Sequence, residues 1–239
     1  MAENDPRIAT FEANNKVYLC FEEGADTQYS DVIVEIGSSG ATGVNMFDEV
    51  PETANLPYTM CFEDRPNVAD YDMNDVVLRC VRKSATQLEL SLVATGAQDL
   101  VNIEGINGTF VSGTDLNNKE VHGLFGVSTD TFVNTKTSDG VVNAVSAIYE
   151  VSESTTIPQF LSNIYIRNIS MGGNEIHVPT IGNPPFALIV PGDFDYPVEQ
   201  VSIINAYTAF RTWANNANNY GAWLDSFVDS KIYTNPYNR

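Results

Sequence analysis

Short apolar runs separated by turn-forming residues constrain the fold of this chain more than any other feature. The runs are rich in β-branched and aromatic residues and lie at residues 17–21, 31–36, 58–62, 76–81, 87–93, 100–103 and 141–149. Clusters of Gly, Asn, Ser and Asp separate them at residues 37–40, 107–108, 117–118, 138–140 and 172–174. Because short strands at this spacing are typical of sandwiches and barrels, we predict an all-β fold, a β-sandwich resembling a jelly roll.

One stretch near the C-terminus has helical spacing instead. Ile203, Tyr207, Phe210 and Trp213 recur every three or four residues, and Ser202 is suited to cap the start of a helix. We expect these apolar side chains to form the buried face of a minor C-terminal helix. The Asn-rich stretch that follows would end it.

A proline pair marks the one candidate boundary. Residues 183–185, Asn-Pro-Pro, cannot lie inside a helix or a central strand, and they lead into an apolar run at 186–190. No stretch reads as a clear linker. We therefore predict a β-sandwich at residues 1–182 and a C-terminal region at residues 183–239 that packs on the same domain.

The charge of the chain narrows the set of partners. The 239 residues include 31 acids and only 12 Lys and Arg, which gives a net charge of −19. A surface this acidic repels polyanions, so we expect no nucleic acid partner, and no phosphate-binding motif indicates a nucleotide. No run of about 18 apolar residues predicts a transmembrane helix. The first residues lack the basic and apolar pattern of a signal peptide.

The cysteines and histidines indicate no catalytic or zinc site. Cys20, Cys61 and Cys80 are too few and too odd in number for a disulfide framework. A bridge from Cys61 to Cys80 or to Cys20 stays open, although buried free thiols are favoured. Neither His122 nor His177 has a ligand or nucleophile partner at suitable spacing.

The densest group of polar side chains lies between two of the apolar runs. Five carboxylates and one carboxamide occur there: Glu63, Asp64, Asp70, Asp72, Asn74 and Asp75. Acids at this density repel one another unless a cation lies among them, and oxygen ligands from a short loop suit Ca²⁺. The loop is not an EF-hand, because its sixth position is Asp75 and its twelfth is Val81. We predict a Ca²⁺ site in which Glu63, from outside the loop, supplies the bidentate ligand.

The same pattern occurs about forty residues earlier, which indicates an internal duplication. Each copy has an apolar strand, Cys-Phe-Glu and a second acid, a polar loop, and an Asp before another strand. We expect each copy to form a β-hairpin, and in the second copy this would bring Glu63 and Asp64 to face Asp75. The first copy supplies a second, weaker candidate metal site: Glu22, Glu23, Asp26 and Asp31.

Two other interpretations of the acidic residues stay open. Two of the carboxylates could flank a glycosidic bond, as in a glycan hydrolase. Alternatively, the acids could cap turns at the strand ends by accepting backbone hydrogen bonds. Metal binding is favoured, because the acids are too many and too close in sequence to divide into one catalytic acid and one base.

Aromatic residues and asparagines are frequent in the last quarter of the chain. Exposed rings stack on sugar rings while amides bond their hydroxyl groups. Tyr220 and Trp223 are therefore candidate ligand-binding residues for a glycan, and the alternative is that such rings belong to the core.

Two parts of the sequence resemble known domains. The pattern Phe-Glu-Asp, then Asp-Tyr-Asp-x-Asn-Asp-Val-Val, at residues 62–64 and 70–77 resembles LruC-type domains of Bacteroidetes surface and secreted proteins. Residues 187–213, beginning Ala-Leu-Ile-Val-Pro-Gly-Asp, resemble the C-terminal region that accompanies them, the domain of unknown function DUF4842. The resemblance implies an exported, β-rich protein of the cell surface, the periplasm or the extracellular space. It would meet a membrane only through a lipid anchor that this sequence does not contain.

These features together predict a non-catalytic, calcium-stabilised binding or adhesion module that is extracellular or at the cell surface. A glycan or a surface protein would be its partner. The alternatives are a carbohydrate-binding protein of a polysaccharide-utilising system and a glycan hydrolase that uses the clustered carboxylates.

Overall fold

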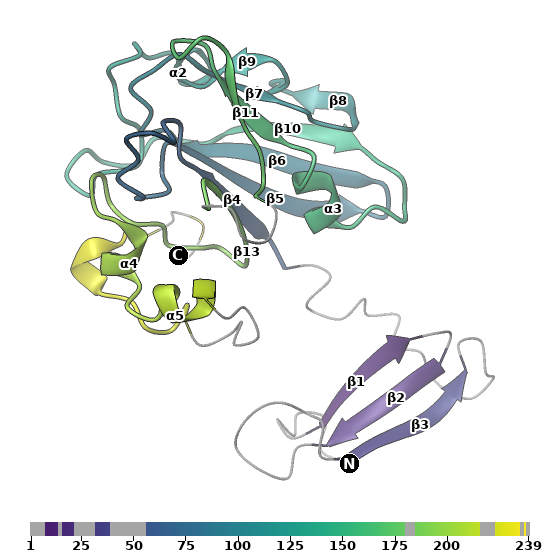
Figure 1. Ribbon diagram of the computed structural model, residues 1–239. Coiled ribbons are helices and arrows are strands. Elements are labelled where there is room, and N and C mark those ends of the chain that lie inside the picture. The colour runs from purple at the N-terminus through teal and green to yellow at the C-terminus, as the bar shows by residue number, and fades with distance from the viewer. Residues whose placement is uncertain are drawn as a thin grey trace. The chain divides into compact units, whose positions relative to one another are not determined.

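The computed structural model describes residues 8–13, 16–21, 32–38, 56–179, 185–215, 223–234 and 237. The chain divides into two compact units, residues 1–54 and residues 55–239 (Figure 1). This division lies far from the predicted boundary at residue 182. The C-terminal region belongs to the larger unit, because one of its strands completes a sheet there.

The smaller unit contains one antiparallel sheet in the order β1-β2-β3, formed by Ile8–Ala13, Lys16–Phe21 and Val32–Ser38. The predicted hairpin of the first copy forms, with Phe21 opposite Val32, whereas strand β1 was not predicted. The loop between β2 and β3 lies outside the described residues. The candidate ligands Glu22, Glu23, Asp26 and Asp31 therefore also lie outside them.

The larger unit contains ten strands in two antiparallel sheets, which confirms the predicted all-β fold. The six-stranded sheet has the order β13 (Ala187–Pro191), β4 (Tyr58–Phe62), β5 (Val76–Ser84), β6 (Gln87–Ala94), β10 (Val145–Glu150) and β8 (Thr109–Gly113). The four-stranded sheet has the order β12 (Asn174–Ile176), β11 (Tyr165–Asn168), β7 (Val101–Glu104) and β9 (Lys119–Glu120). Residues 141–144, which were predicted to start a strand, precede β10.

The main core lies between the two sheets. Leu78, Leu90 and Tyr149 come from the six-stranded sheet, and Ile103 and Ile166 come from the four-stranded one. Two short helices, α2 (Val121–Phe125) and α3 (Ile157–Leu161), add their apolar faces to this core. Burial of each such side chain stabilises the fold by about 1.5–3 kcal/mol.

A second core covers the opposite face of the six-stranded sheet. Side chains alternate along a strand, so Met60 and Phe62 enter the first core while Cys61 between them enters the second. Cys61, Val77 and Val93 pack there against residues of the C-terminal region. Because both faces of these strands are buried, their sequences are continuous apolar runs.

The predicted C-terminal helix is two short helices, α4 (Ile203–Ala206) and α5 (Phe210–Asn215), and a 3₁₀ turn, η1 (Asp229–Lys231), follows. A single helix is wrong because Tyr207 is extended, with φ −116° and ψ 97°, and pairs with Phe227 in a β-bridge. Ser202 occupies the cap position without a side-chain capping bond. Ile203, Tyr207 and Phe210 are buried, as expected.

Cys61 and Cys80 are buried free thiols, as favoured, and lie in different cores on opposite faces of the sheet. Among the described residues, no helix is long and apolar enough to cross a membrane.

Candidate metal centre

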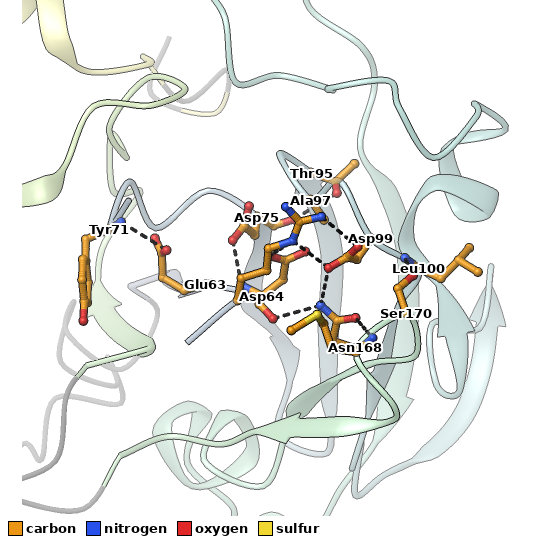
Figure 2. Close-up of polar contacts among 12 residues, drawn as sticks. Glu63, Asp64, Tyr71, Asp75, Thr95, Ala97, Asp99, Leu100, Asn168 and Ser170 are labelled. Carbon is orange, nitrogen blue, oxygen red and sulfur yellow. Dashed lines mark hydrogen bonds and ion pairs between the residues drawn. The ribbon is translucent and has the colours of Figure 1, made fainter. Parts of the chain in front are cut away.

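The hairpin of β4 and β5 brings the acidic residues together. Phe62 pairs with Val76 in the last register position, so the acids on either side of the loop meet where the strands end. The backbone N–H of Asp64 donates to Asp75 Oδ2 at 2.7 Å (Figure 2). Asp64 and Asp75 therefore meet across the loop mouth, as the hairpin predicted.

The Glu63 carboxylate stabilises the backbone of the acidic loop. Its carboxylate accepts the backbone N–H of Met73 at 2.6 Å and of Tyr71 at 3.2 Å. Tyr71 and Met73 both have a φ of 58°, in the left-handed region, which costs about 1–2 kcal/mol for a residue with a side chain. The Glu63 bonds offset this strain. They give the loop a conformation in which left-handed residues alternate with Asp70, Asp72 and Asn74.

The C-terminal region also forms hydrogen bonds with this loop. Gln200 N–H donates to Asp72 Oδ2 at 2.7 Å, and Asn74 Nδ2 donates to the Pro197 carbonyl at 3.1 Å. Ile203 N–H donates to the Tyr71 carbonyl at 2.6 Å. Sequence reasoning missed these contacts, because they join residues more than 120 positions apart.

Three of the predicted ligands fit around a single ion. Glu63, Asp70 and Asp72 each offer one carboxylate oxygen, and these oxygens lie within 4.8 Å of one another. Oxygen ligands at about 2.3–2.6 Å from Ca²⁺ on opposite sides of the ion would be about 5 Å apart. The spacing therefore allows all three to bind the same cation.

Two of these ligands, Glu63 and Asp70, border a polar pocket of about 140 Å³. Its carboxylates are Glu63, Asp64, Asp70, Asp75 and Glu199. Among the described residues that line it, Arg65 alone is cationic, and its guanidinium makes a bidentate pair with Asp99 at 2.7 and 2.8 Å. Asn168 donates to Asp99 as well and to the Asp64 carbonyl. Arg65 is thus engaged at the rim and leaves most of the negative charge uncompensated.

The electrostatics of the pocket favour proton uptake by its acids. Burial, with a smaller contribution from neighbouring carboxylates, raises the pKa of Glu63 to about 7 and the pKa of Asp72 to about 8. Burial and Asp99 raise the pKa of Asp64 to about 6, and the pKa of Asp75 lies well above its usual range. Without a cation, the ionised pocket is under repulsion.

Three buried oxygens around the pocket have no hydrogen-bond partner among the described residues: Asp64 Oδ2, Asn74 Oδ1 and Glu199 Oε2. An unsatisfied buried acceptor costs about 1–3 kcal/mol. All three are oxygens with free lone pairs, which is the donor type that Ca²⁺ takes.

The candidate glycan-binding residues do not join this centre. Trp223 is 3% exposed and packs with its ring against Phe194, Tyr207 and Phe210, so it offers no face to a sugar. It is a residue of the second core. Tyr220 lies outside the described residues.

The histidines lie apart from the metal candidates. His122 is buried, with Nδ1 at 2.6 Å from Glu120 and Nε2 at 3.0 Å from the Ala97 carbonyl. His177 is exposed and contacts Glu175 at 2.8 Å. Each has a carboxylate partner and no second metal-binding side chain in these contacts.

The C-terminal segment that contacts the acidic loop also matches a known family model. Residues 180–223 match the family model described as "Domain of unknown function (DUF4842)". Comparison with curated proteins found no match, and comparison with solved structures found none either. We call residues 180–223 the DUF4842 segment. It contains Pro197, Gln200 and Ile203, which form hydrogen bonds with the acidic loop, and Glu199, which lines the pocket.

Proposed function

We propose that the acidic pocket binds Ca²⁺ and that the protein is a non-catalytic, calcium-stabilised binding or adhesion module. The carrying observation is the pocket itself, where five carboxylates meet and the single lining cation is paired with Asp99. The unpartnered Asp64 Oδ2, in a residue only 3% exposed, supports a ligand there beyond the protein's own groups.

The chemistry of the donors favours Ca²⁺ over other common ions. Carboxylate and amide oxygens surround the pocket, whereas zinc prefers nitrogen and sulfur ligands. Magnesium demands a compact octahedron and retains several waters, whereas calcium accepts six to eight oxygens in an irregular shell. An open pocket with several carboxylates from different segments suits the larger ion.

Burial argues against the hydrolase alternative. Glu63 and Asp72 are each about 1% exposed, and each carboxylate already accepts backbone N–H groups. A catalytic acid and base must flank the scissile bond of a bound sugar. Side chains this enclosed support a structural role.

A surface location fits an ion site of this kind. Extracellular modules bind Ca²⁺ with dissociation constants of about 0.1–1 mM. The resemblance of the acidic segment to LruC-type surface and secreted proteins supports export. We therefore place the protein outside the cytoplasm, with calcium holding the fold that presents its binding surface.

Isothermal titration calorimetry of the metal-free protein with CaCl₂ tests the proposal. We expect saturable binding that Asp72→Asn weakens by at least about tenfold, since the variant removes one ligand charge. Glu153→Gln removes an exposed charge away from the pocket and is the matched control. Two results would overturn the proposal. One is the absence of binding heat up to 10 mM Ca²⁺, roughly ten times the largest dissociation constant expected. The other is equal binding by Asp72→Asn and the wild type.

A further inference from the structure

Gly96 has no Cβ, and two unsatisfied oxygens lie close to the position that a Cβ would occupy. Its N–H donates to the Asn74 carbonyl at 2.9 Å, so its backbone lies against the acidic loop. A Cβ at Gly96 would stand 2.1 Å from Asn74 Oδ1 and 2.9 Å from Glu199 Oε2. Both oxygens therefore lie close to the same glycine, where a side chain would displace them.

The direction of the Asn74 amide is imposed by its other contact. The Pro197 carbonyl can only accept, so the amide NH₂ faces it and Oδ1 is held toward Gly96. Turning the amide over would satisfy Glu199 but would set two oxygens against each other at Pro197. Asn74 is fully buried, so water cannot easily relieve either arrangement.

The backbone of the DUF4842 segment fixes Glu199 in this position. Glu199 N–H donates to the Thr135 carbonyl at 3.0 Å, and the next residue, Gln200, donates to Asp72. Glu199 also lines the pocket that Glu63 and Asp64 border. A cation in this pocket would thus meet oxygens from two segments that are distant in sequence.

We infer that Glu199 and Asn74 are ligands of the pocket cation, and that the cation controls docking of residues 194–215, the part of the DUF4842 segment that follows β13, onto the face of the six-stranded sheet. The inference rests on the calcium site proposed above and adds its regulation. Without the ion, Glu199 repels the acidic loop, and the contacts from Pro197 to Ile203 loosen. With the ion bound, the same carboxylate joins the segment to the loop.

Two buried thiols report on this docking and serve as probe and control. Cys61 lies in the second core, beneath the C-terminal region. Cys80 lies in the first core, between the two sheets. Release of the segment would expose Cys61 alone, whereas global unfolding would expose both thiols.

The experiment measures alkylation rates at the two cysteines by mass spectrometry, in protein carrying Cys20→Ser to remove the third thiol. We expect alkylation of Cys61 to be at least about tenfold faster in EDTA than in 5 mM CaCl₂, a concentration roughly five times the largest dissociation constant expected for such sites. The alkylation rate of Cys80 should be the same under both conditions. Glu199→Gln should raise the Cys61 rate in CaCl₂ toward its EDTA value. Glu199→Asp, which keeps the charge, should fall between the two, and Glu153→Gln should match the wild type.

Three outcomes would overturn the inference. The first is an unchanged Cys61 rate while calorimetry detects Ca²⁺ binding, which leaves the proposed calcium site standing. The second is equal acceleration of Cys61 and Cys80 by EDTA, which indicates global unfolding. The third is a Glu199→Gln protein that binds Ca²⁺ and protects Cys61 as the wild type does. Absence of Ca²⁺ binding in calorimetry would instead reject the proposed function as well.

Discussion

The larger unit contains two acidic clusters, one on the four-stranded sheet and one at the acidic pocket, and the pKa values of their carboxyl groups shift in opposite directions. On the four-stranded sheet, Arg167 Nε donates to both oxygens of Glu104 at 2.9 Å, and its guanidinium lies 2.6 Å from Glu175. Tyr165 also donates to Glu104 at 3.0 Å. The hydrogen bond from Arg167 is the main cause that lowers the pKa of Glu104. His177 and Arg167 lower the pKa of Glu175.

In the acidic pocket the pKa values of the carboxyl groups move the other way. Burial is the largest cause for Glu63, Asp64, Asp72 and Asp75, and neighbouring acids add to it. Arg65, the cation among the described residues that line the pocket, is engaged by Asp99. The difference indicates that the first cluster carries its own counter-charge, whereas most of the described carboxylates of the pocket have none in contact, which is the basis of the proposed cation site.

Adding that counter-charge should give the largest effect. At a Ca²⁺ concentration one hundred times Kd, binding stabilises the folded state by about 2.7 kcal/mol, which corresponds to a rise in Tm of roughly 5–11 °C for a domain of this size. Thermal melts in EDTA and in CaCl₂ measure it. Asp72→Ala and Asp75→Ala should abolish the rise, and Arg167→Gln should keep it. An equal rise in those two pocket variants would remove the distinction between the clusters.

A methyl group at residue 96 should disrupt the acidic pocket without changing its charge. Gly96 has no positive φ, so Gly96→Ala adds only a methyl group, which would collide with Asn74 Oδ1. Overpacking of this kind costs about 1–3 kcal/mol, and we expect the calcium-dependent rise in Tm to shrink as well. Gly123→Ala is the matched control, because its Cβ meets only Glu120 Oε2 at 3.4 Å. Equal calcium responses in the two variants would show that this space is not used.

Raising the pH should destabilise the calcium-free protein. The pKa of Glu63 is raised to about 7 and that of Asp72 to about 8, against values of about 4 in the unfolded chain. Between these limits the folded state binds more protons, so its stability falls as pH increases. We expect Tm in EDTA to drop by a few degrees from pH 5 to pH 8 and CaCl₂ to restore it at pH 8. A Tm in EDTA that rises over this range would contradict the raised pKa values.

The paired cluster should give the smallest effect. Arg167 is partly exposed, and surface ion pairs contribute little to stability. We expect Arg167→Gln to lower Tm slightly, and by the same amount in EDTA and in CaCl₂. Differential scanning calorimetry under both conditions checks this. A calcium-dependent change would mean that the two clusters are coupled.

Strand periodicity predicted most of the strands that are buried on at least one face, although it missed β11, one face of which is buried. The limits predicted for β4 agree with the structure, and the hairpin of β4 and β5 was expected from the apolar runs on either side of the acidic loop. Strand β8, whose residues are all exposed, and the two-residue β9 were not predicted, because neither contains a buried apolar pattern. The interruption at Tyr207 was also missed, since the bridge to Phe227 is non-local.

The same limit applies to the candidate metal centre. Glu63, Asp64, Asp70, Asp72, Asn74 and Asp75 could be selected from the sequence because they lie in one short segment. Glu199 could not, because it lies more than 120 residues later and no local pattern relates it to the acidic loop. The family match at residues 180–223 was the one signal that pointed to its surroundings.

The sequence by itself determined the all-β class and the acidic hairpin, and it was the origin of the calcium hypothesis. These follow from local periodicity and from the charge density of one loop, which are properties of neighbouring residues. Only the tertiary structure decided that Trp223 is a core residue, that Arg65 is engaged by Asp99, and that Glu199 meets Asn74 above Gly96. Those outcomes depend on contacts between distant segments, and packing selects such contacts only once both faces of the sheet are covered.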